Sequence, residues 1–461
     1  MISVDILPGD VLLEMFKFHL YEDLSEKERE EAWQTLVHVC RRWRSIVFGS
    51  PRHLKLQLVC THATPTRDML DVWPSLPLII LCEGDYPKGS VDNIIAGLQR
   101  RDRVCQVILK DVWSSDWDIL FAAMQQPFPE LTRLEFWPND ETMPIIPDLL
   151  LGGSAPRLEI LQSGGVSFPG LPKLLLSATH LVSLHLYNIP HPGYISPDAV
   201  VTALSTLTSL DSLVLQFQSA RSFPGRESRR PPPSTRSVLP ALTGLWFKGV
   251  TEYLEDLVAR IDAPRLNALT VSFLNDIVFD TPQLIQFINR TPASKALEKA
   301  RITLLGDAAS VNFSSHTSGY GTLNVDILCR GLDWQLSSLE QVFTSCLPPF
   351  SILEDLYLPH SLPDNPNRKD KIDNGLWQEL LHPFIAVKNL HLSKDFALHI
   401  GPALQELVEG RTTEMLPALQ NIFLEGFESS EPIQEGIGQF VAARQVAGYP
   451  IAVSRWDDKP L

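Results

Sequence analysis

A leucine pattern recurs along most of this chain and restricts what the chain can fold into. The pattern has the form L-x-x-L-x-L, in which other apolar residues can replace leucine. Its first seven copies start at Val104, Leu131, Leu158, Leu181, Leu210, Leu242 and Leu266. Successive starts are therefore 23 to 32 residues apart. Further copies start at Leu353, Val387 and Leu419, and residues 297–304 and 323–327 are weaker candidates. Such a period predicts an array of similar structural units.

The spacing is typical of leucine-rich repeats, in which each unit holds one strand and one returning segment. Alternate leucines of the x-L-x-L core point inward from a parallel strand. Five of the intervening stretches have helix-like patterns, at residues 197–207, 253–261, 282–288, 336–346 and 402–408. We therefore expect an α/β fold, an irregular solenoid with a curved parallel sheet. It should be irregular because only Asn139 occupies the position of the usual turn asparagine. An ordinary α/β sheet domain with leucine-rich strands is the alternative.

Composition and charge narrow the classes of partner. Of the 461 residues, 44% are hydrophobic and 20% are charged, which is enough apolar content to build a large core. The formal net charge of -15 argues against a nucleic-acid or anionic-membrane partner, because phosphate binding needs clustered Lys and Arg.

The six cysteines form no CxxC pair, and no basic and apolar leader opens the sequence. These features favour a reduced, intracellular location, cytoplasmic or nuclear.

The first fifty residues have the pattern of helices. Pro8 suits a first helical turn, and an apolar stripe follows at Val11, Leu12, Met15 and Phe16. Ser25 and Glu28 have the spacing of a capping box, so a second helix should begin there. Apolar residues from Trp33 to Val47 recur at intervals of three and four, which predicts one continuous face on that helix.

Two segments of this region resemble the F-box motif. They read Leu7-Pro8-Gly9-Asp10-Val11-Leu12-Leu13-Glu14-Met15-Phe16 and Val37-His38-Val39-Cys40-Arg41-Arg42-Trp43-Arg44. The resemblance implies three short helices that bind the Skp adaptor, and through it the cullin, of a ubiquitin ligase. Matching positions imply the residues that face this adaptor: Leu7, Pro8, Val11, Leu12, Met15, Val39 and Cys40. A helical cap packed on the repeats is the alternative.

Three parts are expected along the chain. Residues 1–56 form the small N-terminal helical F-box domain, 57–100 form a connecting segment with the first solenoid strand at 78–81, and 101–461 form the repeats. Two polar segments interrupt the repeats, at residues 219–237 and 364–374. Both should be solvated loops, and the first, rich in Pro and Arg, could also bind an acidic partner.

Catalytic and metal-binding motifs are missing from the sequence. There is no GxxxxGK[ST] phosphate loop, GxGxxG, HExxH or GxSxG, and no Cys/His cluster with zinc spacing. We therefore expect a protein without catalytic residues, metal or cofactor.

A target should bind the sheet face that the repeat leucines do not occupy. The x position between the last two leucines of each copy points to this face. The residues there are Ile108, Glu135, His185, Val214, Trp246, Thr270, Tyr357, His391 and Phe423. Aromatic anchors dominate protein interfaces, so Trp246, Tyr357 and Phe423, with His185 and His391, are the expected target-binding residues. Alternatively, end loops cover them and make them a second core.

The expected function is that of a substrate-recognition adaptor of a Skp–cullin–F-box ubiquitin ligase, which needs no chemistry of its own. The Pro-rich, degenerate repeats resemble those of F-box proteins from mushroom-forming fungi. A leucine-rich-repeat scaffold without a ligase is the alternative, and an α/β hydrolase or transferase is a more distant one. The sequence does not identify the target.

Overall fold

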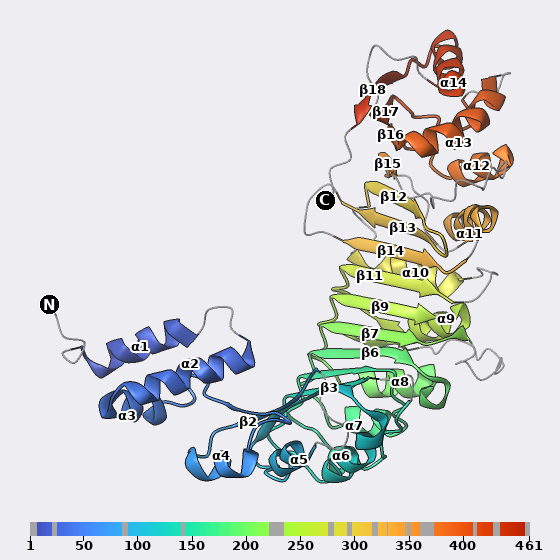
Figure 1. Ribbon diagram of the computed structural model, residues 1–461. Coiled ribbons are helices and arrows are strands. Elements are labelled where there is room, and N and C mark those ends of the chain that lie inside the picture. The colour runs from blue at the N-terminus through green and yellow to red at the C-terminus, as the bar shows by residue number, and fades with distance from the viewer. Residues whose placement is uncertain are drawn as a thin grey trace. The chain divides into compact units, whose positions relative to one another are not determined.

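The computed structural model describes residues 7–20, 25–84, 91–139, 143–220, 235–274, 281–292, 297–315, 321–329, 331–345, 347, 352–359, 373–408, 413–426 and 434–456. It is a mixed α/β structure with a large, mostly parallel, open sheet (Figure 1). The chain divides into two compact units, Met1–Ile195 with Thr202–Ser209, and Ser196–Val201 with Leu210–Leu461. Among the described residues, no helix is long and apolar enough to cross a bilayer.

Three helices open the first unit: α1 (Gly9–Leu20), α2 (Glu26–Val39) and α3 (Arg41–Gly49). Ser25 caps α2 with the predicted capping box, in which the Ser25 N–H donates to the Glu28 carboxylate at 2.8 Å. The prediction of one continuous helix from Trp33 to Val47 is wrong. Cys40 is extended, with φ -158°, and its Sγ accepts from the Trp43 N–H at 3.4 Å. This residue therefore separates α2 from α3 and caps α3.

An aromatic cluster attaches these helices to the start of the sheet. The indole of Trp33 is buried, and its Nε1 donates to the Gln57 carbonyl at 3.1 Å. The ring of Trp73, which follows α4 (Thr66–Val72), lies 5.2 Å from the Trp33 ring and 6.2 Å from that of Phe48. The helices α2 and α3 therefore pack against the segments that lead into β1 and β2.

The strands of the first unit pair in chain order and in parallel. They are β1 (Leu58–Cys60), β2 (Leu78–Cys82), β3 (Val104–Val112), β4 (Arg133–Pro138), β5 (Ile160–Gly164) and β6 (Ser183–Ile189). Its shorter helices are α5 (Asp92–Leu98), α6 (Trp117–Ala123) and α7 (Leu171–Leu175), with 3-10 turns η2 (Ser114–Asp116), η3 (Leu150–Gly153) and η4 (His191–Gly193). The segment predicted as the first strand is the second, because β1 precedes it.

The strands of the second unit are parallel except for β13. Their order is β7-β9-β11-β14-β13-β12-β15-β16-β17-β18. They are β7 (Ser212–Phe217), β9 (Gly244–Gly249), β11 (Ala268–Phe273), β12 (Lys299–Leu304), β13 (Ala309–Ser314), β14 (Thr322–Ile327), β15 (Asp355–Leu358), β16 (Asn389–Leu392), β17 (Asn421–Glu425) and β18 (Ala452–Trp456). β13 is antiparallel to both β12 and β14. A separate parallel pair joins β8 (Ser237–Val238) to β10 (Ile261–Asp262).

Every copy of the leucine pattern contributes a strand, and both weaker candidates do as well, as β12 and β14. The leucines at the inward positions are fully buried, for example Leu134, Leu213 and Leu390. Burial alternates along β11, β12 and β14, so their other face is only half-buried. The prediction of parallel strands with an inward leucine face is confirmed.

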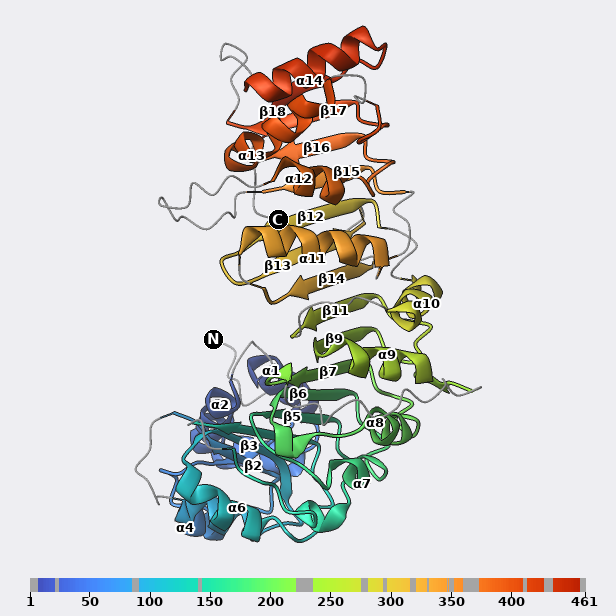
Figure 2. The same cartoon turned by 90° about the vertical axis from the view of Figure 1, so that its right-hand side faces the viewer.

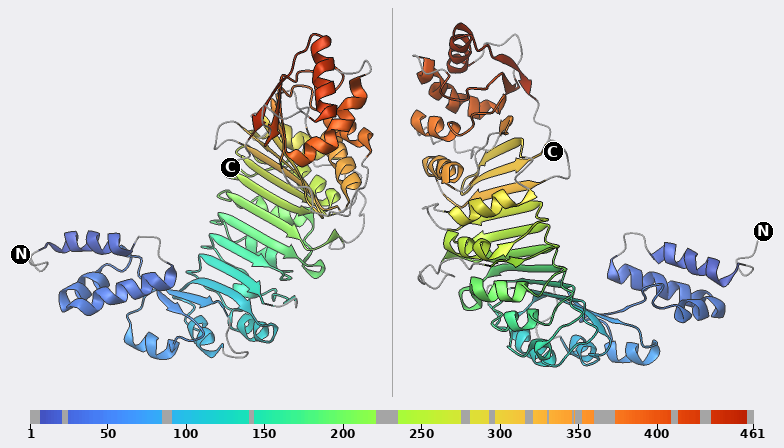
Figure 3. Two further views of the ribbon diagram at one scale, coloured as in Figure 1. Left: turned by 45° about the horizontal axis from the view of Figure 1, so that its top comes forward. Right: turned by 180° about the vertical axis from the view of Figure 1, so that it is seen from behind.

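Figures 1 and 3 show α11 on one side of β14. This is the side of the buried leucines, because helices of the second unit contact its strands there. These helices are α8 (Pro197–Leu204), which straddles the boundary between the units, α9 (Thr251–Arg260), α10 (Pro282–Arg290), α11 (Leu332–Ser345), α12 (Asn374–Leu381), α13 (Lys394–Gln405) and α14 (Glu435–Val446), with the 3-10 turn η7 (Glu406–Val408). The five predicted crossover helices are present. Pro402 does not begin one of them, because α13 begins eight residues earlier and is capped by the Ser393 hydroxyl.

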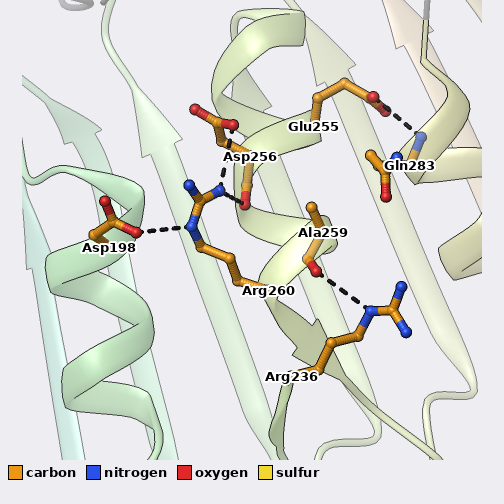
Figure 4. A network of polar contacts seen from close by, with 7 residues as sticks. All are labelled: Asp198, Arg236, Glu255, Asp256, Ala259, Arg260 and Gln283. Atoms are coloured by element: carbon orange, nitrogen blue, oxygen red, sulfur yellow. Dashed lines mark hydrogen bonds and ion pairs between the residues drawn. The ribbon is translucent and has the colours of Figure 1, made fainter. Parts of the chain in front are cut away.

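Polar side chains join neighbouring helices of this layer (Figure 4). The buried guanidinium of Arg260 donates to Asp198 of α8 at 2.7 Å and to the Asp256 carbonyl at 2.6 Å. The Glu255 carboxylate accepts from the backbone N–H groups of Gln283 and Leu284, at 3.1 and 2.7 Å. It thereby satisfies the start of α10, where Thr281 makes no side-chain cap. Figure 2 shows α8, α9 and α10 following one another along the layer.

Most of the two predicted polar loops lies outside the described residues, in 221–234 and 364–372. The described cysteines, Cys40, Cys60, Cys82, Cys105 and Cys329, form no disulfide with one another. The division of the chain at residues 56 and 100 stays a prediction.

The half-buried Glu30 on α2, beside β1, generates a test of the helix–sheet contact. Burial raises the pKa of this carboxyl from 4.5 to about 7, against hydrogen bonds from the Val59 backbone and Gln34. Ionisation of Glu30 at a given pH requires more free energy in the folded state than in the unfolded state. The free energy of unfolding should therefore fall as pH rises from about 4.5 through about 7.

Glu30→Gln should abolish the fall in the free energy of unfolding with rising pH. The variant should therefore be more stable than wild type at about pH 8 and nearly as stable as wild type at about pH 5. Urea unfolding followed by tryptophan fluorescence measures both values. Asp71→Asn, which removes an exposed carboxylate from α4, is the control. A stability difference between Glu30→Gln and wild type that does not change with pH would contradict the raised pKa of Glu30.

Candidate protein-interaction surfaces

The helix α1 has apolar side chains on two sides. Leu12, Phe16 and Leu20 are at most 2% exposed and form the inner side, against α2 and α3. Val11, Met15 and Phe18 are 42%, 49% and 75% exposed and form a second, outward line, which we call the α1 stripe. Positions four and three apart lie above one another on a helix, so the stripe is continuous.

The α1 stripe lines a shallow depression together with Asp10 and Glu14. Glu14 also contacts Lys17 at 3.7 Å and His53 at 3.1 Å. The depression is therefore lined by three apolar and two acidic side chains. A short helix with three exposed large apolar side chains is a surface suited to a protein partner.

The residues expected to face the adaptor do not share one environment. Pro8, Val11, Met15 and Val39 are exposed, whereas Leu7 and Cys40 are half-buried. Leu12 is fully buried, so its prediction as a partner-facing residue is wrong: the side chain is part of the helical core. Sequence reasoning missed Phe18, the most exposed member of the stripe, although its spacing from Val11 and Met15 could have revealed it.

The second surface is the sheet face opposite the helices in the second unit, which we call the open face. Strand register aligns one residue from each strand in a single row across this face. In strand order, the row holds Val214, Trp246, Thr270, Asn324, Asn312, Arg301, Tyr357, His391, Phe423 and Ser454. The predicted x positions of this unit all lie in the row.

Three rings of the row stack directly on one another. The Tyr357 and His391 rings are 4.1 Å apart at 12°, and the His391 and Phe423 rings are 4.5 Å apart at 8°. The Trp456 ring approaches His391 edge-on at 5.5 Å. We call Tyr357, His391 and Phe423 the aromatic stack. Burial, followed by the neighbouring Asp355, raises the pKa of the Tyr357 phenol.

His391 lies inside the stack and is only 9% exposed, so its prediction as an exposed target contact is wrong. Its Nε2 is 3.9 Å from the Asp355 carboxylate, and its buried Nδ1 has no hydrogen-bond partner within the described residues. Tyr357 and Phe423 are half-buried. The loops that follow their strands lie largely outside the described residues, so the alternative that end loops cover these side chains stays a prediction.

A ladder of amides runs beside the stack. The Asn389 amide donates to Asp355 at 2.6 Å, and the Asn421 amide donates to Asn389 at 2.8 Å. Further along the row, the Asn324 amide donates to the Thr270 hydroxyl at 3.2 Å. These bonds hold polar side chains upright between strands and leave the open face ordered before any partner arrives.

Trp246 is not part of the aromatic stack. Four strands, β11, β14, β13 and β12, separate its strand from β15. Its half-buried ring lies over Gly244, where an added Cβ would be 2.4 Å from Cζ3. The three aromatic residues singled out in the sequence therefore lie on one face, but only two of them cluster, and their role in target binding stays a prediction.

His185 lies in the first unit, within a different group. It hydrogen-bonds Ser183 through Nε2 at 3.0 Å, and its ring is 5.9 Å from that of Tyr187. Burial lowers the pKa of His185, and the nearby Glu135 carboxylate partly offsets this. Glu135 is itself buried and pairs with Arg133, and two further predicted face residues, Ile108 and Val214, are also buried.

The described part of the chain contains no group of three His, Cys, Asp or Glu side chains that could hold a metal ion. No protein-family model matches the chain, and no curated protein is significantly similar to it. Support for the candidate surfaces therefore comes from the residues of this chain alone.

The buried and the exposed side of α1 should differ in how much an introduced charge lowers stability. Leu12→Asp places an unpaired carboxylate in the core between α1, α2 and α3 and should lower the free energy of unfolding by about 3 kcal/mol or more. Met15→Asp adds the same charge to the α1 stripe and should change it by less than about 1 kcal/mol. Urea unfolding followed by tryptophan fluorescence gives both values. Equal losses in the two variants would show that α1 has no free side.

Proposed function

We propose that this chain is the substrate-recognition adaptor of a Skp–cullin–F-box ubiquitin ligase. In this proposal, residues 1–56 are an F-box domain that binds the Skp adaptor, and the leucine-rich-repeat-like body holds a target protein. The chain carries out no catalysis itself, because the partner components of the ligase supply it. The target-binding residues are Tyr357, Phe423 and Trp246 of the open face, with His185 in the first unit.

The α1 stripe is the observation that carries the proposal. It lies on the helix that follows Leu7-Pro8, where the resemblance to the F-box motif places the adaptor-facing residues. Val11 and Met15 belong to both sets and are exposed. A helical domain whose only role was to cap the repeats would bury its apolar side chains against them, and this stripe remains outside the core.

The attachment of the helical domain also favours an adaptor. A ligase adaptor has to hold its target at a fixed position relative to the rest of the complex. Trp33, Phe48 and Trp73 pack together, and Trp33 is hydrogen-bonded to Gln57. Such packing fixes the helices relative to the start of the sheet more firmly than a flexible linker would.

A repeat scaffold without a ligase remains the second candidate. It would use the open face in the same way but would leave the α1 stripe for another partner or for none. The two candidates therefore differ in one interaction, the binding of the Skp adaptor.

Co-purification with the Skp adaptor tests the proposal. Wild type should form a stable complex, and Met15→Asp should weaken it by about 2 kcal/mol or more, roughly thirtyfold, because the carboxylate would enter an apolar interface. Leu398→Asp, on an exposed leucine of α13, is the matched control and should bind as wild type does. Titration calorimetry measures the three affinities.

Absence of a complex with wild type would leave the scaffold candidate. A complex that Met15→Asp forms as tightly as wild type would place the docking surface elsewhere than the α1 stripe. Removal of residues 1–50 is a poorer test, because it would also uncover Trp73 and the Gln57 carbonyl.

A further inference from the structure

The strand β1 is at one end of the large sheet, and among the described strands it pairs with β2 alone. The Leu58 N–H donates to the Pro77 carbonyl at 2.9 Å, on the side of β2. Backbone N–H and C=O groups alternate in direction along a strand, so those of Gln57 and Val59 point away from β2. An edge strand normally presents such groups to any further strand that approaches.

Two side chains of α2 bind these outward backbone groups. The Trp33 indole N–H donates to the Gln57 carbonyl at 3.1 Å, and the Glu30 carboxyl accepts from the Val59 N–H. The Gln34 amide also donates to this carboxyl, at 3.2 Å. Glu30 and Trp33 are three residues apart, so they lie on one side of the helix. These two side chains, which we call the α2 cap, therefore replace one acceptor and one donor of a neighbouring strand.

The strand next to the α2 cap is apolar and carries no charge. Leu58, Val59 and Cys60 are at most 3% exposed. Their neighbours on β2, such as Ile79 and Ile80, are buried as well. Apolar edge strands pair readily with one another when they are uncovered, and many proteins protect them with charges or bulges. Here the helix α2 gives that protection.

The outward groups of β1 are complementary to those of a second copy. When two β1 edges meet antiparallel about a twofold axis at Leu58, Gln57 of each chain is opposite Val59 of the other. The Val59 N–H of each chain then donates to the Gln57 carbonyl of the other. These are the two groups that the α2 cap binds, so the cap and a second copy exclude one another.

We propose that the α2 cap prevents this chain from pairing with a second copy of itself through β1. While the cap is in place, the N–H and the carbonyl that would join the copies are already hydrogen-bonded. When both contacts are lost, α2 separates from the edge more often, and two uncovered edges form an antiparallel pair. The inference does not rest on the proposed function, because it applies equally to a repeat scaffold without a ligase.

Hydrogen exchange and sedimentation velocity on the full-length protein test the inference. Glu30→Ala combined with Trp33→Phe removes the acceptor and the donor of the cap but keeps an aromatic ring. Exchange of the Val59 amide should become about thirtyfold faster, because each lost hydrogen bond contributes about fivefold. Mass spectrometry of peptides that cover β1 measures this rate. The double variant should also form a dimer that wild type does not form at the same concentrations.

Three further variants separate the cap from a general loss of stability. Glu30→Gln keeps an acceptor oxygen and should form no dimer. Val59→Pro, added to the double variant, removes the N–H that joins the copies but none of the bonds to β2, and should abolish the dimer. Trp137→Phe removes an indole N–H that donates to Glu135 at 3.3 Å on β4, away from this edge, and should form no dimer.

A folded double variant that stays monomeric would overturn the inference. A dimer that persists after Val59→Pro would overturn it too, because another surface would then join the copies. Exchange of the Val59 amide at the wild-type rate would show that the cap does not cover the edge. If circular dichroism shows the double variant to be unfolded, the two single variants at Glu30 decide: exchange should be about fivefold faster in Glu30→Ala than in Glu30→Gln, and equal rates would overturn the inference.

Discussion

Burial of one face of the parallel strands is the constraint on which the rest of this structure depends. Each strand presents its leucines to the same side, and residues such as Leu245, Leu269 and Leu356 are buried there. A fully buried leucine contributes roughly 1.5 to 3 kcal/mol, so the repeated pattern outweighs local irregularities in loop length. The helices cover this side, and the opposite face of the second unit carries mainly polar and aromatic side chains.

Regular strand pairing then converts sequence spacing into rows of neighbours. Tyr357, His391 and Phe423 are 34 and 32 residues apart in the chain, yet their rings stack because β15, β16 and β17 pair without a shift. The same register sets Asp355, Asn389 and Asn421 into an amide ladder. The contacts of a polar or aromatic residue on the open face are therefore set by the residues at the same register position on adjacent strands.

The N-terminal helices follow a different rule, because three short helices cannot bury all of their apolar surface. The α1 helix uses Leu12, Phe16 and Leu20 for its own core and leaves Val11, Met15 and Phe18 outside. The break at Cys40 turns α3 back, so that the Trp43 ring packs 4.7 Å from that of Phe16. Internal packing and an outward apolar stripe are consequences of the same short helices.

The sequence by itself determined where the strands of the leucine pattern lie, where α2 begins, and which residues of those strands point away from the leucine core. These properties depend on local rules, namely alternation along a strand and the spacing of a capping box. Only the tertiary structure decided that Leu12 is buried while Met15 is exposed, that β13 reverses direction, and that Arg301 belongs beside the aromatic stack and Trp246 does not. Burial and neighbourhood depend on which element covers which face and on strand register, and these are set by packing between segments far apart in the chain.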